Sequence, residues 1–127
     1  MTIDHAAIAC NNVDALREWY ERVLGFEVRF RKPPSRPAGQ PAYLVGPRGS
    51  AVAIELMGED GSKRPERGSH SPGLSHLAFR VEDFPLWEAL LSERGVAWTG
   101  PAGEALGGGR VRSFLDPEGN MLQIVER

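Results

Sequence analysis

Two histidines stand at the start of short apolar segments that have the pattern of strands. The first lies in IDHAAIAC and the second in SHLAFRV. At period two, His76 shares a side with Ala78, and the apolar Leu77 falls on the other side. An imidazole beside an alanine leaves room for solvent, a substrate or a metal ion. The pattern therefore marks His76 as a candidate for chemistry without choosing among the three.

Two further strands carry a polar residue in the same way. Glu55 lies within AVAIELM and Gln123 within NMLQIVE, each flanked on both sides by bulky apolar residues that would face a helix. Imidazole nitrogens and carboxylate or amide oxygens suit a borderline divalent ion, so the set predicts a metal site. The set is His5, Glu55, His76 and Gln123. The alternative for each residue taken singly is a hydrogen-bonded or solvent-exposed side chain.

The spacing of these residues follows an internal repeat. In each half, a strand with a histidine leads into an amphipathic segment that stops at a glycine and is followed by another strand. Glu55 comes fifty residues after His5, and Gln123 comes forty-seven after His76. We expect a single domain over 1–127 with modules 1–57 and 74–127. The polar, Gly-, Ser- and Pro-rich segment 58–73 is expected to link them.

Each module is expected to be one helix and four strands. Asn12 is a candidate N-cap and Gly25 a stop for the first helix. In the second module Asp83 or Glu82 would begin the helix, Pro85 fits its first turn and Gly95 would end it. Further strands are expected at 42–46, 50–57, 96–99, 110–115 and 120–126. The predicted fold class is α+β, two tandem βαβββ modules forming a curved open sheet.

Two segments between these elements allow further expectations. In FEVRFR at 26–31 apolar and charged residues alternate, which predicts a half-buried strand with Val28 and Phe30 facing inward. The segment GPAGEALGGG at 100–109 is expected to be a loop in solvent, with movement over a site as the alternative.

The composition excludes several function classes. The chain has 127 residues, 25% of them charged, and a net charge of −2, which gives no basis for binding nucleic acid or an anionic membrane. No apolar run is long enough to span a bilayer, and the N-terminal residues lack the pattern of a signal peptide. Cys10 is the lone cysteine, which excludes an intrachain disulfide and favours a cytoplasmic location.

These motifs resemble the vicinal oxygen chelate superfamily, the glyoxalase, bleomycin-resistance and extradiol-dioxygenase group. The matching pieces are IDHAAI, WYERVLGFEV, AIELM, SHLAFRVED and DPEGNMLQIVE. The resemblance implies a fold of two βαβββ modules around a divalent metal (Zn, Ni, Co, Mn or Fe), a small-molecule substrate and a homodimer. It also implies that the four residues above are the metal ligands, and that a partner's second module can complete the site of the first.

Some residues depart from the family pattern. Gln123 stands where bacterial glyoxalase I usually has a glutamate that acts as base, and an amide accepts no proton at neutral pH. Ala9 stands where the family's glutathione-binding arginine is expected, and an asparagine expected near Gly58 is missing. These departures count against lactoylglutathione lyase activity. Glu55 is the remaining carboxylate of the set and the candidate catalytic base.

Three hypotheses of function follow. The first is a metal-dependent lyase or isomerase in which the ion binds two adjacent oxygens of the substrate. The second is a metal-free protein that binds or sequesters a small molecule in a cavity lined by Trp19, Trp87, Trp98 or Tyr43, any of which would otherwise belong to the core. The third is a dimeric scaffold without chemistry. Arg110 and Arg112 would receive an anionic substrate or remain solvated charges at a strand edge.

Overall fold

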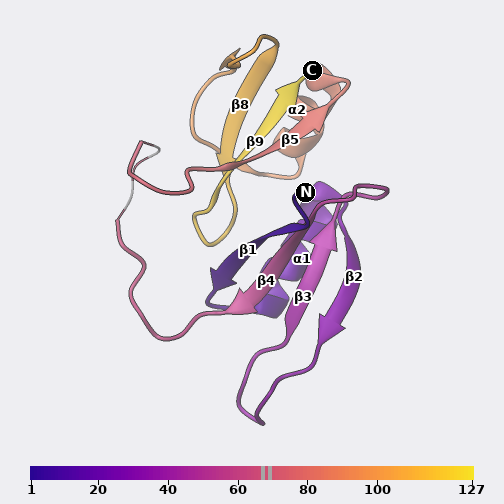
Figure 1. Ribbon diagram of the computed structural model, residues 1–127. Helices are drawn as coiled ribbons and strands as arrows, with labels where there is room; N and C mark the ends of the chain where they lie inside the picture. Colours follow the sequence, from indigo (N-terminus) through magenta and orange to yellow (C-terminus); the bar gives the residue numbers. More distant parts are fainter. Residues whose placement is uncertain (67, 69) are drawn as a thin grey trace. The chain divides into compact units, whose positions relative to one another are not determined.

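One strand–helix–strand pattern occurs twice along the chain in the computed structural model, which describes residues 1–66, 68 and 70–127 (Figure 1). The chain divides into two units, Met1–Lys63 and Arg64–Arg127, each with its own sheet and helix. The expected α+β fold with two βαβββ-like modules is therefore confirmed. The border between the units falls inside the segment 58–73, and a single domain over the whole chain stays a prediction.

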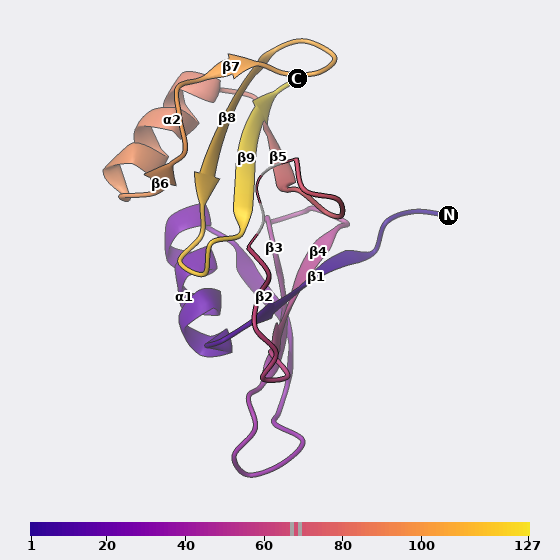
Figure 2. The same cartoon turned by 90° about the vertical axis from the view of Figure 1, so that its left-hand side faces the viewer.

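The first unit is a four-stranded mixed sheet with a helix on one face (Figure 2). Its strands lie in the order β1-β4-β3-β2, with β1 parallel to β4 and the other neighbours antiparallel. The elements are β1 (His5–Cys10), α1 (Val13–Leu24), β2 (Glu27–Lys32), β3 (Ala42–Gly46) and β4 (Ala53–Gly58). The parallel pairing of β1 with β4 brings the two ends of the module side by side.

Local signals set both ends of α1. The side chain of Asn12 accepts a hydrogen bond from the backbone N–H of Ala15 at 3.0 Å, as an N-cap does. Gly25 ends the helix with a left-handed backbone at φ 70°, which glycine adopts without steric cost. The buried stripe of the helix faces the buried side of the sheet, where Ile54 and Leu56 of β4 lie. The opposite side of the sheet carries His5 and Glu55.

The expectation for β2 is wrong in one respect. Phe30 is 60% exposed and Val28 is 38% exposed, and every residue of the strand is classed as exposed. The register shifts between these two residues, which marks a β-bulge at Arg29. After the bulge Phe30 lies opposite Leu44, on the side of the sheet away from α1, so the extra residue reverses the faces that the alternation predicts.

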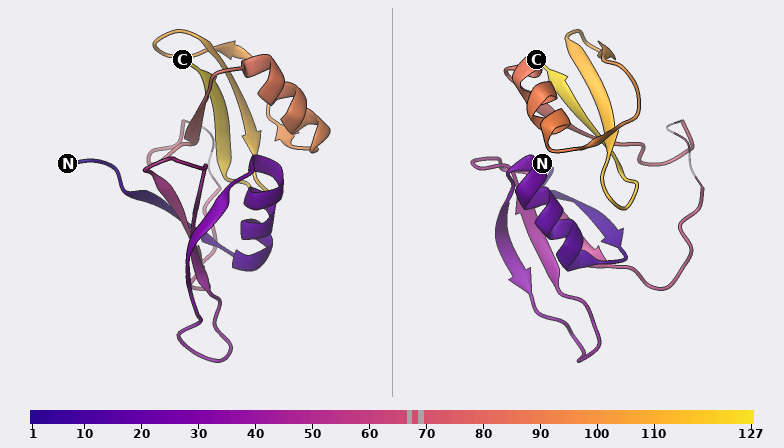
Figure 3. Two further views of the ribbon diagram at one scale, coloured as in Figure 1. Left: turned by 90° about the vertical axis from the view of Figure 1, so that its right-hand side faces the viewer. Right: turned by 180° about the vertical axis from the view of Figure 1, so that it is seen from behind.

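The second unit repeats the plan with one strand broken in two. The strand order is β5-β9-β8-β6, β5 is parallel to β9, and β7 pairs with β8. The elements are β5 (Leu77–Val81), α2 (Phe84–Glu93), β6 (Ala97–Trp98), β7 (Gly103–Glu104), β8 (Arg110–Leu115) and β9 (Met121–Glu126). Seen from behind, each helix lies in front of the sheet of its own unit (Figure 3).

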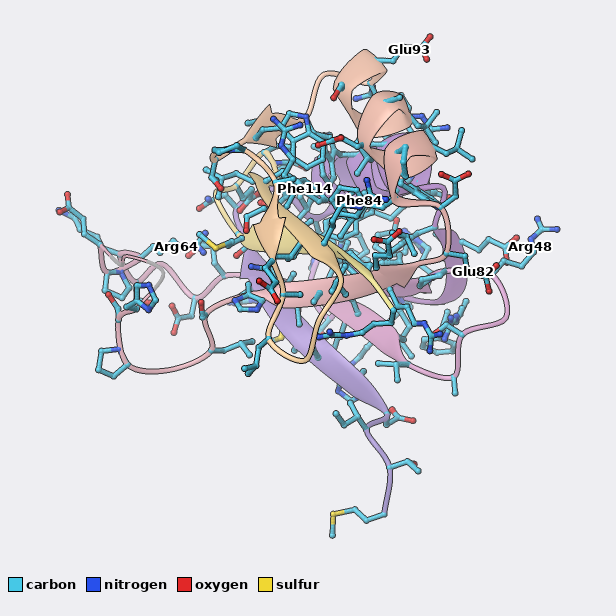
Figure 4. The ribbon with its side chains drawn as sticks, turned by 90° about the horizontal axis from the view of Figure 1, so that it is seen from above. Arg48, Arg64, Glu82, Phe84, Glu93 and Phe114 are labelled. Carbon is cyan, nitrogen blue, oxygen red and sulfur yellow. The ribbon has the colours of Figure 1, made fainter. Side chains whose placement is uncertain are left out.

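The core of the second unit lies under α2. Asp83 caps the helix by accepting from the N–H of Leu86 at 2.9 Å, and a proline follows in the first turn. Phe84 of α2 and Phe114 of β8 are fully buried side chains of this core, while Glu93 points away from it at the end of the helix (Figure 4). The helix ends at Glu93 with Arg94 as its C-cap, one residue before the expected stop at Gly95.

The motif DPEGN forms a turn between β8 and β9. Asp116 is only 4% exposed and accepts hydrogen bonds from the backbone N–H groups of Glu118 and Asn120, both at 2.9 Å. Arg64, at the start of the second unit, donates to the carbonyl of Glu118 and to the side chain of Asn120. This motif therefore shapes the turn that precedes the strand of Gln123. Neither helix in the described part of the chain has the length and apolarity needed to cross a bilayer.

Candidate metal site

His5 and Glu55 meet on the open face of the first sheet. In the register of β1 and β4, His5 pairs with Ala53 and Ala7 with Glu55, so all four side chains share the face away from α1. The two functional groups approach closely, with 3.4 Å between His5 Nε2 and Glu55 Oε2. Both side chains stay partly open to solvent, at 40% and 34% exposure. The pair is within reach of a small ligand.

Asp4 lies against the other ring nitrogen of His5. Its Oδ2 is 2.8 Å from Nδ1. The hydrogen bond from Asp4 raises the pKa of the His5 imidazole above its usual value; burial opposes this rise, and the charges of Asp4 and Glu55 add to it. A carboxylate at Nδ1 favours the tautomer with its proton there, which leaves Nε2 as the free nitrogen. Sequence analysis missed Asp4, because neighbours in a strand normally point to opposite faces.

The chemistry of this pair fits a divalent ion. When Asp4 holds the proton at Nδ1, His5 Nε2 and the Glu55 carboxylate both present lone pairs to one another. Two ligands about 2.1 Å from one tetrahedral ion would lie about 3.4 Å apart, which agrees with the observed 3.4 Å between His5 Nε2 and Glu55 Oε2. A nitrogen and an oxygen donor suit zinc and its neighbours in the first transition row.

The second unit holds the other two predicted ligands. His76 directly precedes β5 and is exposed, with Nδ1 3.0 Å from the hydroxyl oxygen of Ser75. Gln123 on β9 pairs with Ala78 of β5 and with Ser113 of β8. Its amide nitrogen donates a hydrogen bond to Ser113 Oγ at 3.0 Å. The amide oxygen is then the atom that could bind a metal ion. Ser113 is a second residue that sequence analysis missed, since its role depends on cross-strand pairing.

The structure thus brings together part of the predicted set. His5 and Glu55 are in contact, and no bond links His76 to Gln123, both of which lie in the described part of the chain. Among residues 1–66, 68 and 70–127, no three His, Cys, Asp or Glu side chains form a group that could hold a metal ion. The four-ligand set therefore stays a prediction.

Two of the aromatic candidates for a cavity, Tyr43 and Trp98, lie on the helix-covered faces, where each bonds to a helix residue. Tyr43 is 7% exposed and donates from its hydroxyl to Asp14 Oδ1 at 2.6 Å. The guanidinium of Arg112 stacks over the ring of Trp98 at 4.2 Å and donates to Glu88 at 2.8 Å. The expectation that Arg112 is a solvated edge charge is therefore wrong, because it is half-buried in a specific cluster.

Arg110 is likewise paired. Its guanidinium donates two hydrogen bonds to the carboxylate of Glu126, both at 2.9 Å, and lies 4.9 Å over the ring of Phe84. These contacts hold Arg110 in the second unit's own structure. The charge of each arginine is already balanced by a carboxylate within ion-pair distance.

Comparison with known proteins agrees with this architecture. A family model described as the Glyoxalase/Bleomycin resistance protein/Dioxygenase superfamily matches residues 2–124. The match covers nearly the whole chain, both modules included. The chain belongs to this superfamily.

Individual relatives are distant. "Glyoxylase I 4" from Arabidopsis thaliana is 29% identical over 126 residues, which cover 97% of this chain and 69% of the plant protein. A superfamily member from Sphaerobacter thermophilus has a solved structure with a TM-score of 0.80 and 25% identity, over 100% of this chain and 98% of its own. TnmS3, an antibiotic binding protein from a Streptomyces strain, gives a TM-score of 0.73 at 22% identity, over 99% and 95%. The last likeness shows the fold alone.

Proposed function

We propose that the protein is a divalent-metal-dependent lyase or isomerase that acts on a small substrate with two adjacent oxygens. The contact of His5 Nε2 with Glu55 Oε2, with Asp4 behind the imidazole, is the observation that supports this most directly. In the proposal His76 and Gln123 complete the ligand set. Family membership supports a metal-dependent activity, since the superfamily name covers glyoxalases and dioxygenases.

The chain's own residues have distinct parts in the proposed reaction. A bound divalent ion supplies polarisation of a substrate carbonyl, which acidifies the neighbouring C–H. Glu55 carries the one carboxylate of the four, so it is the residue that would take the proton from that carbon and return it to the adjacent one. Asp4 holds the His5 ring in place. Gln123 would bind the ion through its amide oxygen and moves no proton.

The substrate in this proposal is not a glutathione adduct. Ala9 occupies the position of the glutathione-binding arginine expected by resemblance, and it lies on the same face of β1 as His5. Its methyl group offers neither charge nor hydrogen bond. The plant relative's name therefore carries over to this chain only as membership in the same group of metal-dependent enzymes.

A metal-free binding protein is the second candidate. Phe30 and Met57, 60% and 41% exposed, share the open face of the first sheet with Leu44, which gives apolar surface beside Glu55. TnmS3 is an antibiotic binding protein with the same fold. A ligand-induced change in tryptophan fluorescence that persists in excess chelator would favour this candidate, and its loss in chelator would favour the enzyme.

The assembly and its location are part of the proposal. We expect a homodimer that binds a small molecule, as the resemblance implies, in the cytoplasm, as the lone Cys10 suggests. Size-exclusion chromatography with light scattering measures the oligomeric state. The dimer matters for the site because a partner can supply two of the four ligands.

Metal content tests the proposal. We expect the protein purified from medium containing Zn, Ni, Co and Mn to hold about one ion per chain, measured by elemental analysis. His5→Ala and His76→Ala should each lose most of it, because each removes one nitrogen ligand. His70→Ala is the matched control, since it removes the remaining histidine, which is outside the set. Near-zero metal in all four proteins would contradict the proposal.

A further inference from the structure

Arg29 reaches over the open face of the first sheet. It is the extra residue of the bulge in β2, and its guanidinium donates to the carbonyl of Pro47 at 2.9 Å. A Cβ added to Gly46 would lie 2.7 Å from Arg29 Nη2 and 3.0 Å from Cζ. The guanidinium therefore occupies the space that a side chain at position 46 would fill.

The strand register places this guanidinium in line with His5. Leu44 pairs with Glu55 across β3 and β4, so the next alternate residue along β3, Gly46, falls opposite Ala53 on the same face. Ala53 in turn pairs with His5. One row across the sheet thus runs from His5 over Ala53 to Gly46. Nothing larger than a methyl group stands in this row between the imidazole and the guanidinium.

Two strand spacings separate the ends of the row, which makes about 10 Å. A metal–oxygen contact of about 2.1 Å and a guanidinium–oxygen contact of about 2.9 Å leave about 5 Å between them. An extended chain of three to four carbons between the two oxygens covers that length. The sheet face beneath it is apolar, because Ala53 and Leu44 line it.

The charge of Arg29 is not neutralised within the described residues. Arg17, Arg110 and Arg112 each have a carboxylate within ion-pair distance, whereas no described carboxylate lies within that distance of Arg29. Its contact is a carbonyl, which leaves further N–H donors of the fork for a ligand. A planar guanidinium held in this way suits bidentate binding of a carboxylate.

We infer that Arg29 binds the distal carboxylate of the substrate, which is therefore a 2-oxo or 2-hydroxy dicarboxylic acid of about four carbons. The inference depends on the proposed function, because the near end of the substrate is taken to lie at His5 and Glu55. It adds a specificity residue and a substrate class to that site. Arg29 acts in binding and takes no part in proton transfer.

Two four-carbon probes separate the parts of this inference. Malate and 2-hydroxybutanoate share the 2-hydroxy acid end, and only the first has a distal carboxylate. We expect the cobalt-loaded protein to bind malate about 10- to 100-fold more tightly in calorimetry, from the charge-assisted bonds that only this probe makes with Arg29. The cobalt absorption spectrum, recorded in parallel, confirms that the ion stays on the protein.

Three variants assign the preference to one side chain. Arg29→Gln should bring the affinities for the two probes to within about twofold, while binding of 2-hydroxybutanoate stays as in the wild type. Gly46→Ala should weaken the preference with the charge retained, because the new Cβ displaces the guanidinium. Arg31→Gln is the matched control with the preference intact, since Arg31 on the same strand donates to Tyr43 on the helix side.

The outcomes distinguish this inference from the function on which it rests. Equal binding of both probes by the metal-loaded wild type, or a preference that survives in Arg29→Gln, overturns the role of Arg29 and leaves the metal site standing. A wild-type protein that takes up no cobalt overturns the proposed function and the inference with it.

Discussion

His5 is held between two carboxylates, and the geometry assigns them different parts. Asp4 Oδ2 lies 2.8 Å from Nδ1, at ideal hydrogen-bond distance, whereas Glu55 Oε2 lies 3.4 Å from Nε2. The shorter contact orients the ring and fixes its proton. The longer contact leaves space for an ion between nitrogen and oxygen. A carboxylate behind a histidine ligand in this way strengthens the ligand.

Replacing Asp4 tests whether its carboxylate controls the protonation of His5. Asp4 raises the pKa of His5, so we expect Asp4→Asn to lower it, measured by NMR titration of the metal-free protein. Because the folded-state pKa is raised, the stabilisation from this pair is complete below the unfolded pKa and is lost as pH rises through the folded pKa. Asp60→Asn, which removes an exposed carboxylate bonded to Ser62, should leave His5 unchanged. An unchanged pKa in Asp4→Asn would refute the assignment.

We expect Ser113 to position the side chain of Gln123 as Asp4 positions the ring of His5. By accepting from the amide nitrogen, it leaves the amide oxygen for the proposed metal ion. We expect Ser113→Ala to lower metal affinity about tenfold, measured by competition with a chromophoric chelator. Ser113→Thr keeps the hydroxyl and should keep the affinity. Ser92→Ala, which removes a hydroxyl of α2 bonded to Trp98, is the control for a general loss of stability.

At the scale of elements, the hairpin between β7 and β8 is built from glycines that have unequal roles. Gly108 and Gly109 both have left-handed backbones, at φ 89° and 80°. An added Cβ at Gly109 would lie 2.1 Å from the backbone oxygen of Glu126, and one at Gly108 would meet nothing within 4 Å. Arg127 donates to the carbonyls of Leu106 and Gly108 and ties the loop to the end of β9.

Alanine at these two positions separates backbone strain from steric contact. We expect Gly108→Ala to destabilise the protein by about 1–2 kcal/mol, from the left-handed backbone alone. Gly109→Ala should cost about 1–3 kcal/mol more, because the backbone of β9 must move away. Urea unfolding monitored by circular dichroism measures both. Equal losses of unfolding free energy in the two variants would show that the close approach of β9 to Gly109 does not affect stability.

Elements with strong local signals could be predicted from the sequence, and those set by pairing could not. Asn12 and Gly25 bound α1 as expected, and β3 and β8 have the expected ranges. The bulge at Arg29 leaves no trace in the alternation of β2, because one extra residue in a strand looks like its neighbours. The two residues of β7 have no pattern of their own and become a strand only by bonding to β8.

The candidate site shows the same division between what the sequence reveals and what it hides. His5 and Glu55 could be found because strand parity and the internal repeat point to one face. Asp4, Ser113 and Arg29 could not, since their roles come from a neighbour outside the strand, a cross-strand hydrogen bond and a bulge. The residues proposed as ligands are thus easier to recognise in this sequence than the residues proposed to assist them.

At the scale of the whole molecule, the proposed ligand set takes two residues from each unit. His5 and Glu55 belong to Met1–Lys63, and His76 and Gln123 belong to Arg64–Arg127. The four come either from one chain or from two chains of a dimer. Removing one histidine destroys the set in both cases, so single variants do not distinguish them.

Mixing two inactive variants makes the distinction. If each site joins the first unit of one chain to the second unit of its partner, a mixed dimer of His5→Ala and His76→Ala chains has one site with all four ligands and one with both histidines missing. Random assembly after refolding makes about half of the dimers mixed. We therefore expect about one quarter of the wild-type metal content to return, measured by elemental analysis.

The alternative arrangement predicts a different number from the same experiment. If each chain supplies its own four ligands, every chain in the mixture lacks one histidine, and no metal returns at any ratio of the two variants. A mixture of His70→Ala and wild-type chains should keep its full metal content. This mixture controls for metal lost during refolding. Recovery that rises to a maximum at equal amounts of the two variants would place the ligands of each site on two chains, because only mixed dimers contain a complete set.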